Sequence, residues 1–300
     1  MVSGQRALVA RAAGPLGRGR AAGGPGVTAR AAVKRLDFFI VGTQKGGTTA
    51  LSAKLARHPA ICCAKPKELH VFDDERRDWT SGDIPDLSAH FPAASDHRLW
   101  GEATPIYMYW PQAIERVARY NPEAKIIVSL RHPAYRALSH WKMEFVRRTE
   151  ELSFAEAISE RGRARVRAAP QVFSYVERGF YAPQIARLLA HFPRQSIFFC
   201  RMEDLYQEEA AVLQALAGFL GADGAFPDDL GPKRVVPVET SGLAVDATAE
   251  LSWLSSLFHD DIRETARLTG LNLGAWTDGT YDETYLTQDL PMAPKRVFSA

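Results

Sequence analysis

The chain has 300 residues, of which 46% are hydrophobic and 24% are charged, a composition typical of a folded protein with a substantial core. No stretch approaches the roughly 18 apolar residues that a membrane helix needs, so no membrane partner is expected. The net charge is only +2, and seven basic residues but no acidic one precede Asp37. The remainder is therefore mildly acidic, which argues against a nucleic-acid-binding surface spread over the fold.

Residues 1–35 are rich in Ala, Gly, Arg and Pro and show no apolar periodicity. This composition predicts a disordered basic leader, because too little apolar surface is present to offset the entropy of ordering. The alternatives are a start site assigned too far upstream, a targeting peptide and a functional basic arm. A secretory signal is not expected, since the leader lacks a continuous apolar segment.

The sequence contains three cysteines, Cys62, Cys63 and Cys200. Two of them are adjacent, no CxxC pair is present, and no His-rich spacing typical of a metal site accompanies them. We therefore expect buried free thiols in a reducing compartment and no metal site.

Short apolar runs predict buried strands, each followed by a helix. The run LDFFIV at 36–41 is the first strand and precedes a helix over 48–57. The second strand is KIIVSL at 125–130, and a helical stretch follows it to about Arg148. Buried strands of this kind are typical of parallel sheets, in which helices cover both faces.

A third strand, SIFFC at 196–200, precedes a helix over about 208–220, and a longer amphipathic helix covers about 247–268. Strand and helix in alternation predict an α/β protein: a P-loop-like three-layer fold with a central, mostly parallel sheet flanked by helices. We expect one domain over 36–276 and a C-terminal tail over 277–300. The segment 148–178 is expected to be a loop that carries several arginines.

The turn after the first strand reads GTQKGGTT, residues 42–49. A turn from a parallel strand into a helix N-terminus presents free N–H groups, and its glycines let the backbone approach an anion. Lys45 adds a positive charge. The pattern indicates a phosphate cradle, with an ordinary tight turn between strand and helix as the alternative.

The lysine of this turn is displaced from the position that nucleotide hydrolases use. Their pattern places lysine directly after the last glycine and a Ser or Thr on magnesium after it. Here Thr48 follows the last glycine, Lys45 stands two places before that glycine, and the strand KIIVSL leads to Arg131 rather than to aspartate. The cradle is therefore expected to work without a metal.

Arg131 stands at the carboxyl end of the second strand, and Ser139 follows two helical turns later. An arginine at that edge can bind a phosphate with two parallel hydrogen bonds, and a serine can donate to the same anion. Taken alone, the segment favours the other interpretation, a solvated arginine and a serine on the helix surface.

The strings TQKGGTTAL and IIVSLRHPAYRALSHW resemble the two phosphate-binding segments of sulfotransferases that use 3′-phosphoadenosine 5′-phosphosulfate (PAPS). Between them, KPKELHVFD and GEATPIYMY are similar to strings of the heparan-sulfate-type branch and its bacterial relatives. The strings RGFYAPQIARLLAHFP and RMEDL also resemble strings of these sulfotransferases. The resemblance covers roughly residues 37–276 and is patchy after 220.

The resemblance implies a role for each matching position. Lys45 would contact the sulfate and the bridging oxygen, and Glu68 would be the general base. The 5′-phosphate would lie against Gly46, Gly47, Thr48 and Thr49, and the 3′-phosphate against Arg131 and Ser139. Lys233 and Arg234 loosely match a further 3′-phosphate loop. A surface basic pair is the other interpretation of these last two.

The residues themselves give a second argument for Glu68. A carboxylate within hydrogen-bond reach of the acceptor can remove its proton, and the flanking Lys65 and Lys67 favour the ionised form. His70 would share the face of Glu68 in an extended segment, as a rival base or as an orienting partner. Ala103 stands where heparan-type enzymes commonly carry a second lysine.

The expected function is transfer of a sulfuryl group from PAPS to a hydroxyl or amine of a carbohydrate or small-molecule acceptor. The second product would be adenosine 3′,5′-bisphosphate. Without an anchor, the enzyme is expected in the cytoplasm. A P-loop kinase of small molecules and a nucleotide-binding regulator without turnover are the alternatives, and the oligomeric state stays open.

Overall fold

The computed structural model describes residues 34–92, 97–231, 243 and 245–286. The predicted leader lies almost wholly outside these residues, as do Lys233 and Arg234 and the part of the tail from 287 on.

A five-stranded parallel sheet forms the centre, with the strand order β2-β3-β1-β4-β5. The strands are β1 (Phe38–Gly42), β2 (Ile61–Cys63), β3 (Leu99–Ala103), β4 (Lys125–Leu130) and β5 (Ile197–Arg201). The three strands expected from apolar runs correspond to β1, β4 and β5. The prediction of a mostly parallel sheet is confirmed, and β2 and β3 extend it on the far side of β1.

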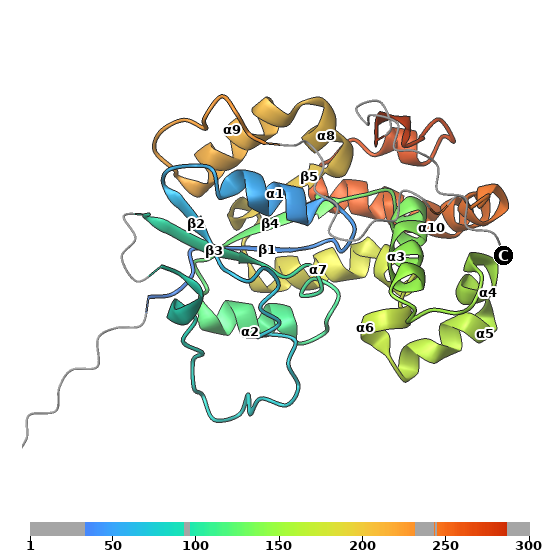
Figure 1. Cartoon of the computed structure of the whole chain (residues 1–300), viewed down its shortest axis with the longest axis horizontal. Coiled ribbons are helices and arrows are strands. Elements are labelled where there is room, and N and C mark those ends of the chain that lie inside the picture. The colour runs from blue at the N-terminus through green and yellow to red at the C-terminus, as the bar shows by residue number, and fades with distance from the viewer. Residues whose placement is uncertain (1–33, 93–96, 232–242, 244, 287–300) are drawn as a thin grey trace, which may run out of the picture. The chain divides into compact units, whose positions relative to one another are not determined.

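Helices cover both faces of the sheet, as the three-layer prediction required (Figure 1). Side chains alternate along β1, so that Phe38 and Ile40 face one side while Phe39 and Val41 face the other. The first side packs against α1 (Thr48–Leu55), α8 (Met202–Gln207) and α9 (Glu209–Leu220). The second packs against α2 (Ala113–Tyr120), α3 (Pro133–Val146), α7 (Tyr181–His191) and α10 (Thr248–Thr269).

The segment 148–178 is largely helical, so the expectation of a loop there was wrong. It contains α4 (Phe154–Ile158), α5 (Glu160–Arg163) and α6 (Pro170–Phe173). Serine caps explain two of these short helices, because Ser153 closes a capping box with Glu156 and Ser159 accepts from the Gly162 amide. Short 3-10 turns lie at Ser88–His90, Ala164–Arg167, Glu177–Gly179, Arg194–Ser196, Gly274–Trp276 and Thr284–Leu286.

The predicted amphipathic helix is α10, which ends at Gly270 in the left-handed conformation. Its carboxylate Asp261 accepts hydrogen bonds from the backbone N–H groups of Tyr181 (2.7 Å) and Ala182 (3.1 Å) at the start of α7. In turn, the Tyr181 hydroxyl donates to the carbonyl of Arg131 at 2.7 Å. Two helices on one face thus fix the residue that follows β4.

All three cysteines are buried free thiols, as expected. Burial raises the pKa of Cys63 and of Cys200 to about 12, so neither thiol is ionised near neutral pH. None of the described helices is both long and apolar enough to cross a membrane.

Candidate functional site

The loop after β1 is fixed to the end of the neighbouring strand β4. The backbone N–H and the hydroxyl of Thr43 both donate to the carbonyl of Ser129, at 2.8 and 3.0 Å. The Ser129 hydroxyl donates back to the carbonyl of Gly46 at 2.6 Å. A Cβ atom on Gly46 would lie 2.5 Å from the Ser129 carbonyl oxygen, so the loop closes only with glycine at this position.

The loop ends in free backbone donors at the start of α1. Gly47 caps the helix with a φ of 83°, a left-handed conformation that suits glycine. Among the described residues, the amides of Thr48, Thr49 and Ala50 have no backbone acceptor. Free amides at the positive end of a helix favour an anion, as the sequence predicted for this turn.

Lys45 carries an uncompensated charge at the mouth of this loop. Its Nζ lies 3.7 Å from the sulfur of Met143, and no carboxylate of the described chain forms a salt bridge with it. Burial first, and then the positive charges of Arg131 and Arg147, lower the pKa of Lys45 to about 8. An anion placed next to Lys45 would relieve both effects, so the electrostatics favour an anionic ligand.

Arg131 lies beside the loop, because β1 and β4 are adjacent and parallel. Its Nη1 donates to the carbonyl of Lys45 at 3.1 Å. The same guanidinium forms a bidentate pair with Glu283, in which Nε donates to Oε1 at 2.6 Å and Nη2 donates to Oε2. Ser139 lies two turns along α3, partly exposed, and its hydroxyl forms no hydrogen bond within the described residues.

Glu68 belongs to a chain of charged side chains in the segment after β2. Lys67 donates to Glu68 Oε1, and Nε2 of His70 lies 3.7 Å from Oε2 of the same carboxylate. The other imidazole nitrogen of His70 lies 2.9 Å from the buried Asp73 carboxylate. The Glu68 amide donates to the carbonyl of Ala103 at 3.2 Å, which brings this segment to the end of β3.

These contacts set opposite charges on Glu68 and His70. Burial raises the pKa of Glu68, but the contact with His70 and the charge of Lys67 outweigh it and lower this pKa to about 2. Asp73 first, and Glu68 second, raise the pKa of His70 to about 10. Near neutral pH the carboxylate is therefore ionised and the imidazole holds its proton.

Buried polar groups support the backbone around Glu68. The Tyr107 hydroxyl accepts hydrogen bonds from the amides of Val71 (3.1 Å) and Phe72 (3.3 Å). Beneath them, the Thr104 hydroxyl donates to Glu102 at 2.8 Å, and burial raises the pKa of Glu102 to about 7. Glu68 and His70 themselves have positive φ values of 65° and 52°. The sequence showed the strings KPKELHVFD and GEATPIYMY. It did not show that Tyr107 of the second string is fully buried and holds the backbone of the first.

A second group that the sequence did not reveal is Arg178. Its Nη1 donates to the side-chain oxygen of Gln44, the neighbour of Lys45, and its Nε donates to Ser174 at 2.8 Å. The guanidinium also lies 5.1 Å from the centre of the Tyr109 ring. Burial lowers the pKa of Arg178 to about 9. Arg178 therefore holds the side chain of Gln44 in place next to Lys45.

Lys45, Arg131 and Glu68 all lie at the carboxyl edge of the sheet, where Arg131 contacts the Lys45 carbonyl and Glu68 contacts the end of β3. The positive charge of Arg131 lowers the pKa of Lys45, whereas the negative charge of Glu68 raises it. One side of the site offers amides and cations to an anion, and the other offers a carboxylate that can accept a proton. Among the described residues, no group of three or more His, Cys, Asp or Glu side chains is placed to hold a metal ion.

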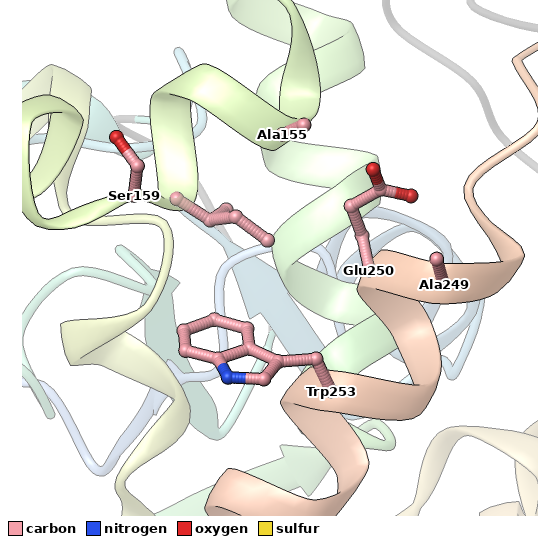
Figure 2. A pocket seen from close by; sticks show the side chains of 6 residues that line it. Ala155, Ser159, Ala249, Glu250 and Trp253 are labelled. Carbon is pink, nitrogen blue, oxygen red and sulfur yellow. The ribbon is translucent and has the colours of Figure 1, made fainter.

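A separate hollow of about 300 Å³ lies between α4 and the first turns of α10 (Figure 2). Ala155, Ile158 and Ser159 line it from the α4 side, and Ala249, Glu250 and Trp253 line it from α10. This hollow contains one carboxylate and no cation, so it does not suit a phosphorylated ligand.

Residues 35–229 match the model of the sulfotransferase domain family. The match covers more than half of the chain, and the chain belongs to this family. A crystal structure of a sulfotransferase from Alicyclobacillus acidocaldarius is similar, with a TM-score of 0.65, 28% identity, and coverage of 81% of this chain and 99% of that one.

Among curated relatives, heparan sulfate glucosamine 3-O-sulfotransferase 6 of Homo sapiens is 31% identical over 217 residues, which cover 71% of this chain and 58% of the relative. The mouse protein of the same name is 31% identical over 201 residues, 66% of this chain and 53% of the relative. A human bifunctional heparan sulfate N-deacetylase/N-sulfotransferase 3 is 30% identical over 197 residues, 61% of this chain and 22% of the relative. The chain thus spans little more than half the length of the first two.

Proposed function

We propose that this protein transfers the sulfuryl group of PAPS to a hydroxyl or amine of a carbohydrate or small-molecule acceptor. Membership of the sulfotransferase family and the likeness to the heparan-type relatives support the reaction class. The observation that carries the proposal is that Lys45, Arg131 and Glu68 lie at the carboxyl ends of three neighbouring strands, β1, β4 and β3.

The donor side of the site follows from the loop and its neighbour strand. The free amides after Gly47 and the hydroxyls of Thr48 and Thr49 would hold the 5′-phosphate. Arg131 would bind the 3′-phosphate with its planar guanidinium, and Ser139 would donate to the same group. Lys45 would stabilise the negative charge that develops on the bridging oxygen as the sulfur–oxygen bond breaks.

The acceptor side follows from the ionised Glu68. In the proposed step, the acceptor oxygen or nitrogen bonds to sulfur while the bond from sulfur to the bridging phosphate oxygen breaks. The acceptor proton passes to Glu68, and adenosine 3′,5′-bisphosphate leaves. His70 holds its own proton near neutral pH, which favours the role of orienting Glu68 through its contacts with Glu68 and Asp73.

Among the possible classes of acceptor, a carbohydrate is the first candidate. The curated relatives are heparan sulfate sulfotransferases by name, and the family match over residues 35–229 includes Glu68 and Arg131. The arginines of α5 and the turn after it are partly neutralised, since Arg163 pairs with Glu177 and Arg165 pairs with Glu150. These pairs reduce the attraction for a highly acidic polymer, so a less charged sugar is the better first candidate.

The direct test uses the purified chain, PAPS with a labelled sulfuryl group, and a panel of oligosaccharides, simple sugars and phenols. We expect label in an acceptor whose mass rises by one SO₃ unit, with equal yield in the presence of EDTA. ATP in place of PAPS should give no product. Phosphorylation from ATP that EDTA abolishes would instead support the kinase alternative, and binding of PAPS without turnover on any acceptor would support the regulator.

A further inference from the structure

The guanidinium of Arg131 is bound by a carboxylate of this same chain. Glu283, seven residues beyond the buried Trp276, faces Arg131 with both of its oxygens. Only 11% of the Arg131 side chain and 10% of the Glu283 side chain are exposed. Arg131 is also the residue proposed above to bind the 3′-phosphate, so the following inference rests on that proposal.

Aromatic contacts hold the segment that carries Glu283 in place. The Tyr281 ring stacks on His132, with ring centres 4.8 Å apart and an angle of 18° between the planes. The same ring meets Tyr135 of α3 edge-on, with ring centres 5.4 Å apart. The Tyr281 hydroxyl lies 3.3 Å from Glu283 Oε1. Glu283 therefore reaches Arg131 from a docked segment rather than from a chance side-chain conformation.

The surroundings of Glu283 are those of an anion subsite. Lys142 lies one helical turn beyond Ser139 on α3, and its pKa is lowered by burial first, then by Arg131, and raised by Glu283. A carboxylate and a phosphate present the same pair of acceptor oxygens to a guanidinium fork. Glu283 thus occupies the donors that a 3′-phosphate would use.

We propose that Glu283 is an internal competitor for the 3′-phosphate of the donor and thereby determines how tightly 3′-phosphorylated nucleotides bind. A nucleotide with a 3′-phosphate must displace Glu283 from Arg131. A nucleotide that lacks this phosphate can fill the loop while the pair stays closed. If the closed pair is about 90% populated, the apparent dissociation constant of the bisphosphate is about tenfold higher than that of the open site.

The same competition assists the release of product. The product, adenosine 3′,5′-bisphosphate, carries the same 3′-phosphate as the donor. Glu283 therefore competes with the product as well as with the donor. When Glu283 pairs with Arg131 again, it replaces the 3′-phosphate of the product and favours its release. Product release limits turnover in many enzymes.

The test compares dissociation constants of adenosine 3′,5′-bisphosphate and adenosine 5′-monophosphate by calorimetry. Glu283→Gln keeps the shape of the side chain but removes its charge, and we expect about tenfold tighter binding of the bisphosphate with unchanged binding of the monophosphate. Tyr281→Ala loosens the segment that carries Glu283 and should lower the dissociation constant of the bisphosphate as well. Glu264→Gln is the matched control, because it breaks a bidentate pair with Arg267 on the surface of α10.

The Arg131→Ala background completes the test. There, Glu283→Gln should bring no gain, since the guanidinium for which the carboxylate competes is absent. Equal or weaker bisphosphate binding by Glu283→Gln, with clear binding by the unaltered protein, would overturn this inference and leave the proposed function intact. Absence of bisphosphate binding by every variant would overturn the donor assignment and the inference with it.

Discussion

The loop after β1 and the segment around Glu68 lie at the same edge of the sheet, but different forces hold them. Backbone and hydroxyl groups fix the loop: Thr43 and Gly46 bond to Ser129 of the next strand. Charged side chains fix the Glu68 segment, where His70 links Glu68 to Asp73. The Glu68 side chain is 39% exposed, whereas Thr43 and Gly46 are buried.

This difference suits the two ligands proposed for the site. A rigid cradle of amides binds one fixed phosphate group with little reorganisation, which is what electrostatic preorganisation requires. A half-exposed carboxylate held by side chains can meet acceptors of varied shape. The donor side therefore tolerates little change in its shape, whereas the acceptor side can adapt to different acceptors.

Lys45→Ala should have the largest effect. It removes the charge beside the bridging oxygen, and we expect kcat to fall by about 10³-fold, in the range found when a key transition-state donor is lost. Single-turnover transfer of labelled sulfate measures the loss. A change of less than threefold would show that the sulfuryl group does not lie against Lys45.

Glu68→Gln should lower kcat by about 10²-fold, because the amide cannot take the acceptor proton. Glu75→Gln is the control on the same segment: that carboxylate pairs with Arg116 and lies outside the proposed site, so turnover should persist. Equal turnover in Glu68→Gln and the unaltered protein would assign the proton to another base.

Gly46→Ala should weaken binding of adenosine 3′,5′-bisphosphate by at least about tenfold, because the added methyl group meets backbone oxygen and forces the loop to shift. Gly218→Ala on α9 is the matched control, since no atom lies within 4 Å of the added carbon. If calorimetry gave the same affinity for both variants, the loop would not be the rigid cradle described above.

The pH dependence of kcat/KM should show one limb, on the alkaline side. The pKa of Lys45 is about 8, so the amine loses its charge as pH rises through this value and activity falls by about tenfold per unit above it. Glu68, with a pKa of about 2, stays ionised down to pH 4 and gives no acidic limb in that range. In Lys45→Arg the alkaline limb should disappear, because arginine keeps its proton; a limb that persists would belong to another group.

Asp73→Asn should have the smallest effect, a loss of stability of less than about 1 kcal/mol near pH 6, because half of the His70 side chain is exposed and screened. Asp73, together with Glu68, raises the pKa of His70 above its ordinary value to about 10. The stabilisation is therefore fully present below about pH 6.5 and is lost as pH rises through 10. Melting temperatures of both proteins at pH 6 and pH 10 should differ at the first pH and converge at the second. A constant difference would show that the pair acts through packing alone.

The strands and the donor side could be predicted because their signals are local. The run KIIVSL became β4 with the expected bounds, and adjacency of parallel strands brought Arg131 to the loop. The strands β2 and β3 escaped prediction, since ICC is short and LWGEA contains glycine and glutamate, which are not typical of strands.

The supporting contacts could not be predicted because they join distant residues. Arg178 contacts Gln44 across 134 positions, and Arg131 contacts Glu283 across 152. No periodicity or spacing marks such pairs before the fold is known. Asp73 lay near Glu68 in the sequence, but its link depends on positive φ at His70, which sequence patterns do not indicate.

The central claim is that the loop and Arg131 bind the donor while Glu68 acts on the acceptor. Binding of adenosine 3′,5′-bisphosphate and transfer of labelled sulfate, measured on the same preparations of the unaltered protein, Arg131→Ala and Glu68→Gln, test it most directly. We predict that Arg131→Ala weakens binding of the bisphosphate by at least about tenfold, in line with the loss of a charged bidentate contact. Glu68→Gln should bind it as the unaltered protein does, yet transfer sulfate about 10²-fold more slowly. Unchanged affinity in Arg131→Ala, or a loss of affinity in Glu68→Gln that matches its loss of transfer, would contradict this division of the site.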